Sequence, residues 1–152
     1  IAANEFSKKH RDFTTKIYAT DVNSEVVKFS KEGLYPDRSL RETPESIQKL
    51  YFKAVEVEGR IKKTVYKIDE GIKKKVTFGT HNLLSSFNQA NLDIVFLRNV
   101  MIYFQSDIKQ KVVSLIQDKV ISGGYLFISL SESLNDIKTE FKFVQSGIYQ
   151  KI

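Results

Sequence analysis

Apolar residues recur along this chain with spacings that alternate between those of strands and those of helices. Short apolar runs predict strands over residues 16–21, 76–78, 92–97 and 125–128. Spacings of three and four residues predict helices over residues 2–13, 22–31, 44–51 and 107–121. The run over 92–97 is almost continuously apolar, which is typical of a buried strand at the centre of a sheet. Strands and helices in alternation predict an α/β fold built on an open sheet with helices on both faces.

Residues with capping chemistry mark where two of these helices begin and end. Asn23 or Ser24 is placed to cap the helix over 22–31, and Gly33 is placed to end it. Pro44 suits the first position of the next helix, with Thr43 placed as its cap. We expect a turn or loop after Gly33.

Two other segments predict antiparallel pairing. Alternating apolar residues over 54–76 indicate a small antiparallel β-subdomain inserted into the main fold, with turns at Gly59 and at residues 69–71. Residues 141–144 and 148–149 indicate a closing hairpin around Gly147. The sequence shows no internal repeat.

Length and composition exclude several classes of protein. The chain has 152 residues, which suits one domain, and it contains no cysteine and only two histidines. A disulfide framework, a thiolate metal site and a multi-histidine metal site are therefore excluded. No apolar run approaches the ~20 residues that span a bilayer, and the start does not resemble a signal peptide. We expect a soluble cytoplasmic domain without membrane insertion.

Positive charge is concentrated in one part of the chain. Residues 49–75 hold nine basic and four acidic side chains, so 9 − 4 = +5 of the formal net charge of +6 lies there. A solvated, lysine-rich sheet edge is the simplest interpretation. An acidic protein partner is the next, and nucleic acid, for which the sequence holds no recognition motif, is the last.

Polar residues follow four of the predicted strands, at the edge where open α/β sheets bind ligands. Asp21 has the chemistry to accept hydrogen bonds from both ribose hydroxyls of an adenine nucleoside, or equally to cap the next helix. Asn82 has the chemistry to read an adenine edge, or to close a local turn. Arg98 and Asn99 place a fixed charge and an amide beyond strand 92–97, and a charge there favours function over packing. The fourth group is Ser129–Ser133.

Several of these segments together resemble the CheR-type chemoreceptor methyltransferases. The segments that carry the resemblance are Ala19–Asp21, Gly33–Pro36, His81–Leu84, Leu92–Phe104, Gly123–Phe127 and Ser131–Ser133. The run Arg-Asn-Val-Met-Ile-Tyr-Phe, followed by Ser-Glu-Ser, is the most specific of these matches. The resemblance extends from about Tyr18 to the C-terminus.

The resemblance implies a Rossmann-like class I methyltransferase that esterifies glutamate side chains of chemoreceptors with a methyl group from S-adenosylmethionine, leaving S-adenosylhomocysteine. By motif position, Asp21 holds the cofactor ribose, and Asn82 and Leu83 contact the adenine. Arg98 and Asn99 line the cofactor cleft. Tyr103 lies beside the transferred methyl group, and Tyr103 and Arg98 are the catalytic candidates. The implied partners are the cytoplasmic helices of chemoreceptors, with the basic β-subdomain facing the receptor, and nucleic acid is not among them.

The family's glycine-rich cofactor loop has no counterpart before Tyr18, nor does its helical N-terminal domain. We therefore expect residues 1–152 to be a partial methyltransferase domain, N-terminally incomplete and drawn from a longer protein. A sheet that lacks a strand exposes an apolar surface, which predicts self-association. The alternative function is a non-catalytic module that binds receptors or other proteins.

Overall fold

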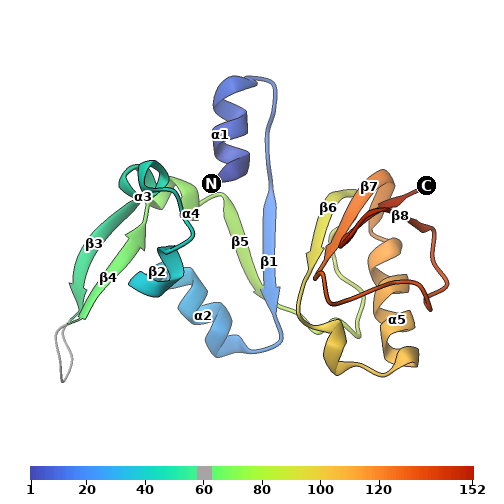
Figure 1. Cartoon of the computed structure of the whole chain (residues 1–152). Helices are drawn as coiled ribbons and strands as arrows, with labels where there is room; N and C mark the ends of the chain where they lie inside the picture. The colour runs from blue at the N-terminus through green and yellow to red at the C-terminus, as the bar shows by residue number, and fades with distance from the viewer. Residues whose placement is uncertain (58–62) are drawn as a thin grey trace. The chain divides into compact units, whose positions relative to one another are not determined.

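The computed structural model describes residues 1–57 and 63–152, which form two compact units, Ile1–Thr80 and His81–Ile152. The elements of the first unit are α1 (Ala2–Lys9), β1 (Ile17–Asp21), α2 (Ser24–Glu32), β2 (Leu34–Pro36), η1 (Asp37–Leu40), α3 (Glu45–Tyr51), β3 (Phe52–Val57), β4 (Lys63–Ile68), α4 (Glu70–Lys73) and β5 (Val76–Thr80). Those of the second are β6 (Leu92–Leu97), η2 (Met101–Tyr103), α5 (Ser106–Gln117), β7 (Val120–Ile128), β8 (Phe141–Gln145) and β9 (Ile148–Lys151). Figure 1 shows these elements along the chain.

The first unit holds two small sheets. β1 and β5 pair in parallel, with Asp21 beside Thr80 at their carboxyl ends, and α2 packs on this pair. The order of the antiparallel sheet is β2-β4-β3, which confirms the predicted antiparallel pairing, although the sheet also takes in β2 and ends at Ile68. The predicted turn at Gly59 lies outside the described residues.

The ends of α2 form as the sequence predicts. The side chain of Asn23 accepts hydrogen bonds from the backbone N–H groups of Glu25 and Val26, so Asn23 and not Ser24 is the cap. Gly33 ends the helix with φ +68°, a left-handed conformation that glycine adopts at little cost.

Three local predictions in the first unit are wrong. The segment after Gly33 is the strand β2 and not a loop, because β4 offers it a pairing partner far away in sequence. Residues 69–71 begin the short helix α4, where the Asp69 side chain accepts from the N–H of Ile72. Pro44, and not Thr43, occupies the cap position of α3, and no side chain caps that helix.

The second unit is a four-stranded sheet with α5 along one face (Figure 1). β6 and β7 are parallel, while β9 is antiparallel to both β7 and β8. The predicted hairpin at Gly147 is confirmed, with φ +74° at that glycine. Fully buried Val112 and Val113 of α5 meet Leu126 of β7 in the core.

Two predictions for the second unit need correction. α5 ends at Gln117 and not at residue 121, because Val120 and Ile121 enter β7 and Val120 pairs with Leu92. β6 is an edge strand of the four-stranded sheet and not a central one. Ile94 and Phe96 on its outer face are 52% and 69% exposed. Self-association through such apolar residues stays a prediction.

A polar cluster fastens α1 to the end of α3. The hydroxyl of buried Tyr51 accepts hydrogen bonds from Asn4 and from Lys8 Nζ, both at 2.9 Å, and donates one to Glu5. Lys8 Nζ also lies 2.8 Å from Glu5 Oε1. The hydrogen bonds from Lys8 and Tyr51 lower the pKa of Glu5, and the bond to Glu5 raises the pKa of Lys8 to about 12.

We predict that acid detaches α1. Because the pKa of Glu5 is lowered on folding, its contribution is complete above the ordinary value near 4.5 and is lost as the pH falls through the lowered value. Glu5→Gln removes the charge at every pH, and an eight-residue helix is marginal without tertiary contacts. Hydrogen exchange of the α1 amides is the measurement. Protection that falls with acid in the natural chain, but is already low in Glu5→Gln at neutral pH, is the expected result.

The matched control is Glu45→Gln, which breaks an exposed pair of Glu45 with Lys49 at 2.9 Å. Exposed pairs contribute little, so exchange in α1 stays unchanged in this variant. Equal α1 protection in Glu5→Gln and in the natural chain would show that the Tyr51 cluster does not hold the helix.

Candidate functional site

The candidate residues fall into two groups, one in each unit. Asp21 ends β1 in the first unit. The others lie after strands of the second unit or before its first strand: Asn82, Leu83, Arg98, Asn99 and Tyr103. Each group lies within a single unit.

Asp21 is exposed and makes one local hydrogen bond. Its Oδ1 accepts from the backbone N–H of Asn23 at 2.8 Å, which closes the turn between β1 and α2. The helix cap is Asn23, so capping does not explain Asp21. Oδ2 has no hydrogen-bond partner among the residues described, and it remains available as an acceptor.

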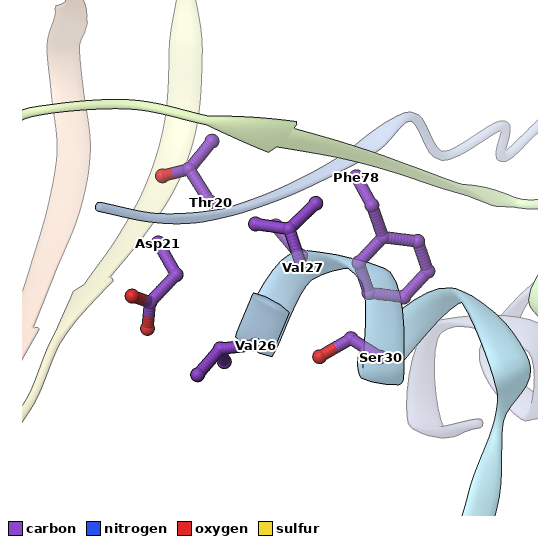
Figure 2. Close-up of a pocket in the computed structure, with 7 residues that line it drawn as sticks. Thr20, Asp21, Val26, Val27, Ser30 and Phe78 are labelled. Carbon is purple, nitrogen blue, oxygen red and sulfur yellow. The ribbon is translucent and has the colours of Figure 1, made fainter. Parts of the chain in front are cut away.

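A small hollow lies beside Asp21, between the β1–β5 pair and α2 (Figure 2). Its volume is about 100 Å³. Its lining residues are Ala19, Thr20, Asp21, Val26, Val27, Ser30 and Phe78. The lining is mostly apolar, with hydroxyls from Thr20 and Ser30 and the carboxylate of Asp21 as its polar groups.

Asn82 closes the local turn that the sequence allowed as one of its two roles. Its Oδ1 accepts from the N–H of Leu84 at 2.9 Å, and its carbonyl accepts from the N–H and hydroxyl of Ser85 at 3.0 and 2.8 Å. The side-chain NH₂ group is a donor left over from this turn. Asn82 is exposed, whereas the neighbouring Leu83 packs against the core of the second unit.

The segment after β6 presents Arg98 and Tyr103 to solvent. Arg98 is exposed and makes no ion pair with any residue that the structure describes. Tyr103 ends the single turn η2 and is 78% exposed, and its backbone N–H donates to the carbonyl of Val100 at 3.2 Å. A large aromatic side chain that is so exposed contributes little to packing among the described residues of its unit.

Asn99 turns its side chain back onto the protein. Its Oδ1 accepts from the hydroxyl of Ser129, and its N–H donates to the same hydroxyl at 3.0 Å. Its φ is +59°, a left-handed conformation that asparagine tolerates better than most residues. No pattern in the sequence predicts this bond to Ser129, because the two residues are 30 apart along the chain.

The chain matches known proteins over almost its whole length. A family model described as "CheR methyltransferase, SAM binding domain" matches residues 1–150. The chain belongs to this family. A chemotaxis protein methyltransferase of Vibrio anguillarum is 34% identical over 141 residues, which cover 90% of this chain and 49% of that protein. Chemotaxis protein methyltransferase 1 of Pseudomonas aeruginosa is 33% identical over 151 residues, 95% of this chain and 53% of that one.

A CheR SAM-binding domain is a class I methyltransferase fold, and its cofactor is S-adenosylmethionine. The expected fold class and cofactor are therefore confirmed. This chain spans about half the length of the curated relatives it matches. Within its described residues no group of three or more His, Cys, Asp or Glu side chains is placed to hold a metal ion. No described helix is long and apolar enough to cross a bilayer.

We predict that Asn23 contributes to the stability of the fold, whereas Asp21 contributes little to stability and serves function. Asn23→Ala removes the α2 cap and lowers the free energy of unfolding by about 1 kcal/mol. Asp21→Asn keeps a side-chain oxygen for the N–H of Asn23, so the change stays within about 0.5 kcal/mol. Urea unfolding followed by circular dichroism measures both. A loss in Asp21→Asn as large as that in Asn23→Ala would return Asp21 to a structural role.

Proposed function

We propose that this chain supplies the cofactor-binding part of an enzyme that transfers a methyl group from S-adenosylmethionine to glutamate side chains of chemoreceptors. The observation that carries the proposal is the exposed carboxylate of Asp21, which has a free oxygen at the carboxyl end of β1, beside an apolar hollow. The family and the names of the similar chemotaxis methyltransferases support it.

The donors and acceptors of the chain fit this cofactor. A ribose diol offers two hydroxyl donors, and Asp21 Oδ2 is an ionised acceptor with no partner among the described residues. Adenine has ring nitrogens that accept hydrogen bonds, and the NH₂ group of Asn82 donates. Leu83 beside it offers an apolar contact for a flat ring. In this proposal Asp21 holds the ribose, while Asn82 and Leu83 hold the adenine.

Arg98, Asn99 and Tyr103 are assigned to the cofactor cleft and the reacting end of the ligand. The guanidinium of Arg98 is a rigid, permanently charged fork that suits a carboxylate. Tyr103 offers an exposed ring and hydroxyl to orient the incoming glutamate. When bound, S-adenosylmethionine supplies a methyl group activated by its sulfonium.

Little acid–base chemistry is required of the chain. A glutamate side chain with a reference pKa of about 4.3 is ionised at neutral pH, so it needs no general base to become a nucleophile. The side chains that line the site have to align the reacting atoms and exclude water. The scarcity of histidine in the chain, which has two, is consistent with this requirement.

The β2-β4-β3 sheet is the proposed receptor-facing surface. Lys53 and Lys67 stand opposite one another on β3 and β4, which places like charges side by side. Glu70 offsets part of this charge: its Oε1 lies 2.9 Å from Lys73 Nζ and 3.1 Å from Lys67 Nζ, and these lysines lower the pKa of Glu70. The remaining positive charge suits acidic segments of receptor helices, mainly by steering their approach.

We predict that Asp21→Asn weakens binding of S-adenosylhomocysteine by about 1.5–3 kcal/mol, or roughly tenfold to a hundredfold in the dissociation constant. The variant keeps the turn to Asn23 and removes the charge that would hold the ribose. Isothermal titration calorimetry of the chain is the measurement. Asp37→Asn, another exposed aspartate of the first unit, is the control and leaves the affinity unchanged.

Two results would contradict this assignment. Equal affinity in Asp21→Asn and in the natural chain would remove Asp21 from the cofactor site. Failure of the natural chain to bind S-adenosylhomocysteine, together with binding to receptor helices, would favour the non-catalytic binding module instead.

We predict that Tyr103→Phe lowers turnover in the whole protein without changing affinity for S-adenosylhomocysteine. The side chain is 78% exposed, so loss of its hydroxyl leaves packing intact and affects only the orientation of the acceptor. Base-labile methyl esters formed on a chemoreceptor cytoplasmic fragment measure turnover, with Tyr125→Phe on β7 as the control. Full activity in Tyr103→Phe would exclude a role for the hydroxyl.

A further inference from the structure

The carboxylate of Glu132 bonds to backbone N–H groups from two separate segments. Its Oε1 accepts from Val100 at 3.2 Å and from Met101 at 2.9 Å, and its Oε2 accepts from Ser129 at 2.9 Å. Val100 and Met101 follow β6, whereas Ser129 follows β7. One half-buried carboxylate therefore joins the two segments that leave the carboxyl ends of the parallel strands.

Ser129 adds a second connection between the same segments. Its hydroxyl, on a residue only 3% exposed, accepts from the N–H of Asn99 and donates to the Asn99 side chain. The N–H groups of Asn99, Val100 and Met101 thus all end on side chains from the segment after β7. The ladder between β6 and β7 stops at Leu97 and Ile128, so strand pairing does not serve these N–H groups.

Hydrogen bonds continue from this point to Tyr103. The carbonyl of Val100 accepts from the N–H of Tyr103 at 3.2 Å, and the carbonyl of Met101 accepts from the N–H of Phe104 at 3.0 Å. Met101 is 2% exposed and is part of the hydrophobic core, so its side chain anchors the turn to the core. The two residues whose N–H groups bond to Glu132 therefore also supply the carbonyls of the turn that carries Tyr103.

We infer that Glu132 is a positioning residue: it fixes the backbone of residues 98–103 and so sets the direction in which Arg98 and Tyr103 leave that backbone. The consequence for a ligand rests on the proposed function, whereas the ordering of the segment does not. Arg98 and Tyr103 are exposed, so the backbone that carries them is the main determinant of where these side chains start.

A carboxylate suits this role better than an amide. Both oxygens of Glu132 act only as acceptors, and three N–H donors converge on them. In Glu132→Gln one oxygen becomes an NH₂ group, which meets an N–H as donor against donor whichever way the amide turns. The side chain keeps its size, so the substitution tests the acceptor and not the packing.

The test is Glu132→Gln in this chain, with Glu140→Gln as the matched control. Glu140 is an exposed glutamate of the same unit whose Oε2 lies 3.6 Å from Lys151 Nζ. Amide hydrogen exchange by NMR and calorimetric titration with S-adenosylhomocysteine are measured for each variant. In Glu132→Gln we expect exchange at Val100 and Met101 to accelerate about tenfold or more, with Val113 and Leu126 unchanged. We expect the dissociation constant to rise by about tenfold.

The outcomes separate the inference from the proposed function. Unchanged exchange at Val100 and Met101 would show that Glu132 does not order the segment. Faster exchange there with unchanged affinity would show that the ordering does not serve the ligand. If the natural chain binds no S-adenosylhomocysteine, the proposed cofactor site fails in this chain, and the exchange data alone decide whether Glu132 orders the segment.

A second variant guards against a general loss of folding in Glu132→Gln. Ser129→Ala removes the hydroxyl that serves Asn99 and leaves Glu132 in place. We expect faster exchange at Asn99, with Val100 and Met101 still protected by the carboxylate. Loss of protection throughout the unit in both variants would make these side chains part of the fold in general, and would overturn the positioning role.

Discussion

The parallel pairing of β6 with β7 is the constraint on which the second unit depends. Parallel strands end at the same edge of a sheet, and the register sets Leu97 beside Ile128. The segments that follow these residues therefore leave the sheet side by side, although they are about thirty residues apart in sequence. Ser129 and Glu132 reach the backbone after β6 only because this register holds.

Two glycines allow that register. The pairing passes from Leu92 with Val120 to Ile94 with Tyr125, so β7 accommodates extra residues over a short distance. Gly123 has φ +82°. A Cβ at Gly124 would lie 2.6 Å from a methyl carbon of Val120 and 3.0 Å from the carbonyl oxygen of Asp93. A side chain at either position would disturb β7 before it reaches Ile128. The segments that follow Leu97 and Ile128 would then no longer leave the sheet at the same position.

Local signals in the sequence predicted local structure well. The cap at Asn23, the stop at Gly33 and the hairpin at Gly147 each depend on one residue's own conformational or hydrogen-bonding preference. The cap at Thr43 and the turn over residues 69–71 were local errors, and the other errors arose where a distant partner decides. Residues after Gly33 form a strand because β4 pairs with them, and no pattern within three residues records that partner. The apolar run 92–97 predicted its strand but not its place at the edge of the sheet.

The site divides in the same way. Strand ends identified Asp21, Asn82 and Arg98 as chemistry-bearing residues, because position after a parallel strand is visible in the sequence. Glu132 lies within the group Ser129–Ser133 that follows a predicted strand, but the sequence does not predict its contacts. Its partners are backbone N–H groups, which every residue except proline possesses, so no residue type at a fixed spacing signals the contact. A carboxylate that accepts hydrogen bonds from backbone N–H groups is therefore recognised only in the three-dimensional structure.

This use of Glu132 has an electrostatic consequence for Arg98. Acidic side chains are few in this stretch: between Arg98 and Ser133 they are Asp107 in α5, Asp118 at the C-terminal end of that helix, and Glu132. Because backbone N–H groups occupy both oxygens of Glu132, that acid is committed to the turn, and Arg98 makes no ion pair with a described residue. Had an acid paired with Arg98, a ligand carboxylate would have to displace it before binding. The same bonds that order the segment thus leave its guanidinium available for an anionic group.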